Sequence, residues 1–481
     1  MSLIARARNA VPWTAVITGS SLAARAIITL VAARFLPPYD LGLFAIVGLV
    51  LGFAGLFSDG GLTQSVVAKR EIAPEQLSSL HWCNVLFGAT AGIALGVAAP
   101  AISFLYSEPR LTDMVLLAAL NFAIAPFGQV SQTLLQKQLS FGRLGLIEVA
   151  SNTSGVIVAL VLLATGSGIY ALILAQLATA FVRSLLLRVA GRALVRTTLR
   201  LRLREIRPFL RFGFFQVGDR AMNFVNTKVD QLLIGAVLGP AALGYYNMAW
   251  TVIVEPVYRI NPIITTVAFP VFAHRQDNPA ALRRGFLIVT KLLSTTNAPM
   301  VLGLAAIAPI AVPLLLGEQW QPSVPLVELL SILAMARAIY NPVGSLVLAV
   351  GRADLSFYRT ITQFAVQTPV YALLLYFAGL VPATWFVCLV NVVAVWLTYL
   401  LMLRPTLGSF SLDYIRSFLP AVSLALGMAV AVRLLATTPI HPRVGMLVAQ
   451  LALGAVLYGG MTLLFRRSDV GEIAGIMTSR P

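Results

Sequence analysis

Residues 35–44 read FLPPYDLGLF, and residues 237–246 read VLGPAALGYY. The second segment repeats the first at an offset of 202 residues, with a proline, a leucine-glycine pair and a final aromatic residue in matching places. Another pair follows in the same order, LSFGR at 139–143 and LSFYR at 355–359. The sequence therefore indicates that the second half of the chain duplicates the first.

The composition requires a membrane as the solvent for most of the chain. Of 481 residues, 58% are hydrophobic and 11% are charged, and the mean hydropathy is +0.86. A soluble domain carries about 25% charged residues. Because a membrane helix needs roughly 20 apolar residues, this chain has enough apolar sequence for more than a dozen. We predict an all-α, polytopic membrane protein.

Apolar runs between charged or Pro/Gly-rich breaks predict about fourteen transmembrane helices. They are residues 12–34, 42–66, 78–103, 113–136, 145–165, 169–187, 213–238, 243–272, 286–313, 323–349, 360–379, 383–403, 417–434 and 445–465.

The distribution of basic residues supports this number of spans. With both termini in the cytoplasm, the inner segments hold 24 of the 35 Lys and Arg residues, as the positive-inside rule requires. Eight arginines lie between Arg188 and Arg211, a stretch suited to anionic lipid headgroups. The net charge of +17 therefore indicates membrane topology and not nucleic-acid binding.

Equivalent positions of the repeat are separated by six spans, an even number, so the two halves have the same orientation. This predicts two parallel six-helix lobes followed by two further helices. The predicted divisions are an N-lobe at 1–190, a basic cytoplasmic linker at 191–212, a C-lobe at 213–404 and a C-terminal segment at 405–481.

A stripe of polar residues runs along one face of the first span and recurs in the seventh. Thr18, Ser21 and Arg25 are spaced three or four residues apart, and the offset of 202 places Arg220, Asn223 and Thr227 opposite them in the repeat. Such a stripe suits a water-filled cavity between the lobes. Hydrogen bonding between packed helices is the alternative for the hydroxyls and amides.

Ionisable groups inside spans face a cavity or a partner because they are costly in hydrocarbon. The cationic candidates for a cavity are Arg25, Arg220, Lys228, Arg259 and Arg337. The carboxylate candidates for ion coupling are Asp59, Asp230 and Glu255. Asp59 equally suits a helix cap, and the four-residue spacing of Glu255 and Arg259 favours an intrahelical pair. Glu148, Arg183 and Glu328 are expected to reach the interface.

The sequence carries no sign of catalysis or of a bound group. It contains no phosphate-binding glycine loop and no His/Cys spacing for a metal site. We expect no enzyme activity, no metal and no cofactor, with transport driven by an ion or substrate gradient.

The segments FLPPYDLGLF at 35–44, FSDGGLTQ at 57–64 and VDQLLIGAVLGP at 229–240 resemble a known family. They are similar to polysaccharide transporters of the multidrug/oligosaccharidyl-lipid/polysaccharide (MOP) flippase superfamily, and most of all to the Wzx-type exporters of colanic acid, amylovoran and teichuronic acid. The resemblance extends over residues 10–404.

This resemblance implies a flippase in the bacterial inner membrane that works by alternating access. The implied substrate is an undecaprenyl-pyrophosphate-linked oligosaccharide, a polysaccharide or lipopolysaccharide precursor, with H⁺ or Na⁺ as a coupling ion. The expected partners are this substrate and membrane lipids, for a monomer that works alone or with polysaccharide assembly proteins.

Two other functions remain open at this point. A drug or cation antiporter of the same superfamily would need an acidic or apolar cavity, whereas these spans hold more bases than acids. A membrane polysaccharide polymerase or ligase would need a large outer loop, and the longest predicted here has about ten residues.

Overall fold

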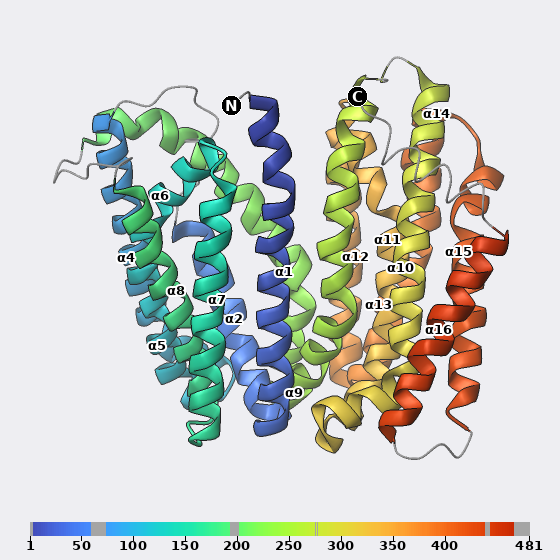
Figure 1. The fold of residues 1–481 in the computed structure, drawn as a ribbon, viewed down its shortest axis with the longest axis horizontal. Helices are drawn as coiled ribbons and strands as arrows, with labels where there is room; N and C mark the ends of the chain where they lie inside the picture. Colours follow the sequence, from blue (N-terminus) through green and yellow to red (C-terminus); the bar gives the residue numbers. More distant parts are fainter. Residues whose placement is uncertain are drawn as a thin grey trace. The chain divides into compact units, whose positions relative to one another are not determined.

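The computed structural model describes residues 3–58, 74–192, 202–274, 276, 278–437 and 443–465. All regular elements in these ranges are helices (Figure 1). The chain divides into two compact units, Met1–Gly244 and Tyr245–Pro481, called unit 1 and unit 2 below. The predicted all-α class is confirmed.

The helices of the first unit, in chain order, are α1 (Leu3–Phe35), α2 (Pro38–Ser58), α4 (Pro74–Leu105), α5 (Arg110–Ile124), α6 (Pro126–Lys137), α7 (Phe141–Ala164), α8 (Tyr170–Gly191) and the first part of α9 (Leu203–His274). Those of the second unit are the rest of α9, α10 (Pro279–Leu316), the short 3-10 helix η1 (Glu318–Ser323), α11 (Val324–Ala349), α12 (Ala353–Ala378), α13 (Leu380–Thr398), the π-helical turn η2 (Tyr399–Leu403), α14 (Arg404–Leu407), α15 (Ser411–Leu435) and α16 (Arg443–Phe465).

Helix α9 consists of two helices joined at Gly239. As one helix its 72 residues would be about 108 Å long, more than three times the hydrocarbon thickness. Gly239 interrupts it with φ 83° and ψ 179°, a conformation that glycine adopts because it has no Cβ. Pro240 then begins the second helix, as its repeat equivalent Pro38 begins α2.

Helices α5 and α6 form one span with a bend of 46°. The bend lies at Pro126, the first residue of α6, whose ring nitrogen donates no hydrogen bond to the preceding turn.

The number of spans agrees with the prediction. In the described ranges, twelve helices are long and apolar enough to cross a membrane, and the bent pair α5–α6 makes thirteen. Gly239 divides one of them, α9, into two, which gives the predicted fourteen.

Several helices begin before the predicted apolar runs. For example, α10 begins at Pro279, where the sequence predicts a start at 286, and α12 begins at Ala353 in place of 360. Hydropathy detects the part of a helix in hydrocarbon, whereas backbone hydrogen bonding continues into the headgroup region. The extra turns carry basic residues such as Arg283 and Arg359.

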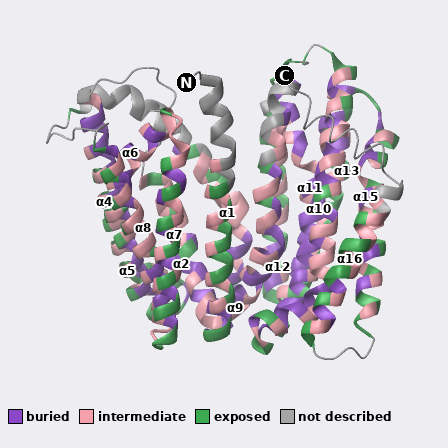
Figure 2. Cartoon of the chain, viewed as in Figure 1, coloured by how far each residue is buried: buried purple, intermediate pink, exposed green. Residues whose placement is uncertain are grey.

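Exposed positions recur along the helices (Figure 2), and many of them carry large apolar side chains, as in a protein surrounded by lipid. Val97 is 77% exposed and Phe104 is 88% exposed, both on α4. Large exposed apolar surfaces are unfavourable in water but suit contact with acyl chains.

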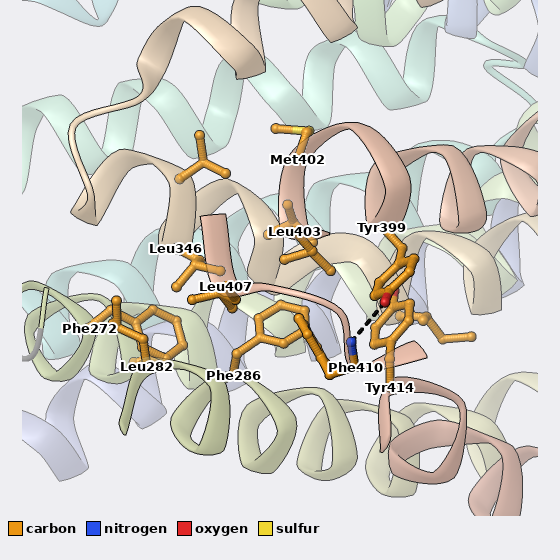
Figure 3. Packing of buried hydrophobic residues seen from close by; sticks show 14 of the residues in the cluster. Phe272, Leu282, Phe286, Leu346, Tyr399, Met402, Leu403, Leu407, Phe410 and Tyr414 are labelled. Atoms are coloured by element: carbon orange, nitrogen blue, oxygen red, sulfur yellow. Dashed lines mark hydrogen bonds between the residues drawn. The ribbon is translucent and has the colours of Figure 1, made fainter. Parts of the chain in front are cut away.

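An apolar cluster of the second unit lies around two aromatic residues, Tyr414 of α15 and Phe410 of the loop before it (Figure 3). The Phe410 N–H donates a hydrogen bond of 2.9 Å to Tyr399 Oη. Phe286 of α10 packs against this pair, with ring centroids 5.9 Å from Tyr414 and 6.4 Å from Phe410. The cluster fixes α10, η2 and α15 together.

The lobe boundaries at 190, 212 and 404 remain a prediction, and much of the basic linker, including 193–201, lies outside the described residues. Asp59 also lies outside them.

Candidate functional site

The polar stripe of α1 is joined to α7 and α8. Ser21 Oγ donates to Glu148 Oε1 at 3.3 Å, and Asn152 Nδ2 donates to Ser21 Oγ at 3.2 Å. Glu148 also forms an ion pair of 3.2 Å with Arg183 of α8. Ser21 therefore takes part in packing within unit 1, the alternative considered for hydroxyl groups in the stripe.

The other two members of the stripe lie on the same side of α1. Thr18 is half-buried, and Arg25, one turn beyond Ser21, is exposed. Because α1 is continuous from Leu3 to Phe35, the predicted spacing along one helical face is retained.

The matching stripe lies on the first part of α9. Arg220 is half-buried and Asn223 is exposed. The Thr227 hydroxyl donates to the backbone carbonyls of Asn223 at 2.8 Å and Phe224 at 3.1 Å. Its hydrogen bonds are therefore made within its own helix. Lys228 Nζ donates to Gln231 Oε1 at 3.3 Å.

Asp230 is the buried carboxylate among the described ion-coupling candidates. It is 8% exposed, and its side chain accepts the Gln231 backbone N–H at 2.8 Å. A hydrogen bond to the charged form lowers the cost of holding a carboxylate inside a span.

Glu255 and Arg259 form the intrahelical pair that their spacing favours. Arg259 Nη2 lies 3.0 Å from Glu255 Oε1, four residues apart on the second part of α9. Both side chains remain partly accessible, at 37% for Arg259 and 19% for Glu255. The pair neutralises two charges within a span.

Arg337 of α11 lies in a cluster of aromatic and amide groups from three helices. Its Nη1 donates to Tyr258 Oη at 2.6 Å, and its Nε donates to Asn391 Oδ1 at 3.4 Å. The guanidinium carbon lies 5.5 Å from the ring centroid of Trp250 and 5.9 Å from that of Tyr258. We call Trp250, Tyr258, Arg337, Tyr340 and Asn391 the arginine cluster; Tyr340 Oη completes it by donating to Asn391 Oδ1 at 3.1 Å.

The structure brings the arginine cluster next to the ion pair. Tyr258 follows Glu255 by three residues and directly precedes Arg259 on the second part of α9. The ion pair and the arginine cluster of unit 2 therefore share this stretch of helix. Arg25, Arg220, Lys228 and Asp230 belong to unit 1.

Sequence reasoning missed the partners that hold Arg337. Asn391 is fully buried in the structure. Its amide stands within the apolar run of α13, and this polar residue in a span is a signal that could have been read from the sequence. Tyr258 and Trp250 resemble ordinary membrane aromatics, because only the tertiary fold brings them to the guanidinium.

Three residues expected to reach the interface form ion pairs. Glu148 pairs with Arg183, as described above, and Glu328 of α11 pairs with Arg433 of α15. Within the described ranges, no three His, Cys, Asp or Glu side chains gather as a metal site would require.

Membrane-spanning helices in this number define a polytopic membrane protein, and charged groups held inside the spans are typical of transporters. The Polysaccharide biosynthesis protein family matches residues 31–325, and the chain belongs to this family. It is a multi-pass protein of the bacterial inner membrane and not an enzyme.

A curated relative supports this assignment over most of the chain. Lipopolysaccharide biosynthesis protein WzxC of Escherichia coli (strain K12) is 31% identical over 417 residues, which cover 87% of this chain and 85% of WzxC.

Solved structures confirm the fold at low sequence identity. The lipid II flippase MurJ in an inward closed conformation matches with a TM-score of 0.74 at 14% identity, over 96% of this chain and 100% of that one. An inward-facing multidrug resistance MATE family transporter of the MOP superfamily matches with a TM-score of 0.60 at 17% identity. The match covers 79% of this chain and 94% of that transporter.

Proposed function

We propose that this transporter moves an undecaprenyl-pyrophosphate-linked oligosaccharide from the cytoplasmic to the periplasmic leaflet by alternating access. The observation that carries the proposal is the arginine cluster. A half-buried guanidinium is held in a fixed orientation by Tyr258 and Asn391 inside a membrane span. Such a group suits a pyrophosphate, because a guanidinium donates paired hydrogen bonds to phosphate oxygens.

The proposed ligand groups are named for each unit by itself. In unit 2 they are Arg259 and Arg337, and in unit 1 they are Arg25, Arg220 and Lys228. The cargo carries phosphates and often acidic sugars, and binding neutralises part of the cationic charge. Partial neutralisation lowers the cost of closing the cavity to water, which allows the protein to change its open side.

The return step is proposed to be coupled to an ion. We assign the binding of the coupling ion to Asp230 and Glu255, which the structure describes, and to Asp59, which lies outside the described residues. Protonation or Na⁺ binding at Glu255 competes with its pairing to Arg259, so a bound ion would release Arg259 for the substrate. The protein is expected to act as a monomer, alone or with polysaccharide assembly proteins.

A drug or cation antiporter is the second candidate, favoured by the fold match to a MATE family transporter. The charges disfavour it, because the cationic candidates outnumber the carboxylates in each unit, three to two in unit 1 and two to one in unit 2. An excess of positive charge repels a cation.

Reconstituted proteoliposomes test the two functions against each other. Lipid-linked oligosaccharide is placed in one leaflet, and its appearance in the other is followed with and without a pH or Na⁺ gradient. Protein-dependent translocation supports the flippase, and an effect of one gradient identifies the ion. If the lipid stays in place while a small organic cation moves, the proposed function is wrong.

A further inference from the structure

A cavity of unit 2 lies between α10 and α15, apart from the arginine cluster. Its volume is about 1040 Å³, the size of a site for a substantial ligand. It is called the α10–α15 groove below. The residues that line it are Pro279, Ala280, Arg283, Arg284, Leu287, Ile288, Lys291, Leu407, Asp413, Arg416, Ser417, Pro420, Ser423 and Leu424.

The groove follows from the two-sided character of α10. One face of this helix is buried in the apolar core, through Leu282, Phe286 and Leu293. The neighbouring face carries Arg284 and Lys291, each displaced from the buried series by one or two positions. The ring of Phe286 packs against that of Tyr414 of α15 (Figure 3), and this contact holds the two helices together.

The groove is strongly cationic. Arg283, Arg284, Lys291 and Arg416 line it with a single carboxylate, so its formal net charge is +3. That carboxylate, Asp413, forms an ion pair with Arg283, whose guanidinium also lies 4.9 Å from the Phe410 ring centroid. Arg283 thus forms part of the wall, and the excess positive charge comes from the other three bases.

Three of the four bases lie at one end of the groove, and the fourth, Lys291, lies beyond the apolar side chains of Leu287 and Ile288. Arg283, Arg284 and Arg416 lie in the first two turns of their helices, and Leu287, Ile288 and Leu424 lie further along. Lys291 lies about 12 Å beyond Arg283 along α10. A ligand that fits this order has a charged head and an apolar body.

The open side of the groove is next to a lipid-facing surface. Leu412, Leu419 and Leu426 of α15 are 57%, 51% and 49% exposed, and their spacing of seven places them on one face. Leu419 directly precedes the groove residue Pro420. The positive-inside rule assigns this end of α10 and α15 to the cytoplasmic leaflet, which carries anionic lipids.

We propose that the α10–α15 groove is a binding site for an anionic phospholipid of the cytoplasmic leaflet. The headgroup phosphate contacts Arg284 and Arg416, and the upper acyl chains lie against Leu287, Ile288 and Leu424. The glycan substrate does not occupy the groove. The role of the groove in lipid binding is independent of the transport cycle proposed above.

Purified full-length protein in detergent tests the site by native mass spectrometry. Phosphatidylglycerol and phosphatidylethanolamine are titrated separately, and the bound lipid is counted. The wild type is expected to bind phosphatidylglycerol about tenfold more tightly than phosphatidylethanolamine. The variant R284Q/R416Q is expected to lose about fivefold in phosphatidylglycerol affinity for each arginine removed, because each base near the lipid surface contributes about 1 kcal/mol.

The matched control is R352Q/R404Q, which removes two exposed arginines outside the groove at the same end of unit 2. Its phosphatidylglycerol affinity is expected to stay within about twofold of wild type. A second variant, Ser423→Trp, fills the groove from an exposed position without changing charge, and it should also lose the lipid.

Four results would overturn the proposal: unchanged lipid affinity in R284Q/R416Q, an equal loss in R352Q/R404Q, tighter binding of polyprenyl phosphate than of phosphatidylglycerol, or displacement of the lipid by millimolar inorganic phosphate. The assay contains no glycan, so its outcome does not depend on the flippase reaction.

Discussion

Gly42 of α2 and Gly244 of α9 each lie against the backbone of the helix that carries the other. A Cβ at Gly42 would overlap the Pro240 carbonyl, and a Cβ at Gly244 would overlap the Pro38 carbonyl. These four residues are two pairs of repeat equivalents, so the contact is reciprocal. A two-fold axis generates this pattern, and the duplicated segments therefore meet each other directly within unit 1.

Adding one methyl group at this contact should destabilise the protein. Gly42→Ala and Gly244→Ala are each expected to lower the free energy of unfolding by about 1–3 kcal/mol, because a backbone carbonyl cannot rotate away as a side chain can. Thermal unfolding of the purified protein in detergent measures the effect as a lower Tm.

Gly48→Ala is the matched control on the same helix, since a Cβ there meets nothing within 4 Å. Alanine is the better helix former, so this change is expected to be neutral or slightly stabilising. Equal Tm values for the Gly42 and Gly48 variants would contradict the close contact.

The fold could be read from the sequence because membrane helices leave a strong signal. The apolar runs and the one-sided basic residues predicted fourteen spans, and the repeat predicted that Pro38 and Pro240 begin equivalent helices. The turns of α10 and α12 beyond the hydrocarbon carry little hydropathy signal, so the sequence did not locate them.

The candidate site was less predictable, because partners far apart in sequence decide what each charge does. The Glu255–Arg259 pair follows from a four-residue spacing. The contacts of Arg337 with Asn391 and of Glu148 with Arg183 depend on how the helices pack, and nothing local in the sequence specifies them.

Glycan export should require the guanidinium group of Arg337 and not only its positive charge. At matched protein levels, Arg337→Ala is expected to reduce glycan export by about tenfold or more, since hydrogen bonds to charged groups contribute about 1.5–3 kcal/mol. Arg337→Lys should restore little, because an ammonium cannot reach Tyr258 and Asn391 while also contacting phosphate in paired geometry.

Arg352→Ala is the comparison for this prediction, because Arg352 is an exposed arginine of the same unit that pairs with Asp354 outside the arginine cluster. Glycan export by this variant is expected to stay near wild type. Normal export by Arg337→Ala would remove this residue from the proposed ligand set.

Variants of the Glu255–Arg259 pair distinguish an ion-coupling role of Glu255 from a purely structural ion pair. Glu255→Gln is expected to abolish the response of transport to a pH or Na⁺ gradient while slow translocation continues. The charge-swapped double variant E255R/R259E keeps an ion pair at the same four-residue spacing. A purely structural pair predicts that the swap restores wild-type gradient dependence. A coupling carboxylate predicts that it does not, since the carboxylate has moved one turn along the helix.

The network of Ser21, Asn152 and Glu148 should stabilise unit 1 by joining α1 to α7. Ser21→Ala removes hydrogen bonds of 3.3 and 3.2 Å, and the expected loss in the free energy of unfolding is about 0.5–1.5 kcal/mol. Combining it with Asn152→Leu in a double-mutant cycle isolates the contact, because both changes remove the same hydrogen bond. A coupling energy of about 0.5 kcal/mol or more is expected from thermal unfolding in detergent. Additive losses would mean that the two side chains do not interact, and Ser21 would return to the candidates for the cavity.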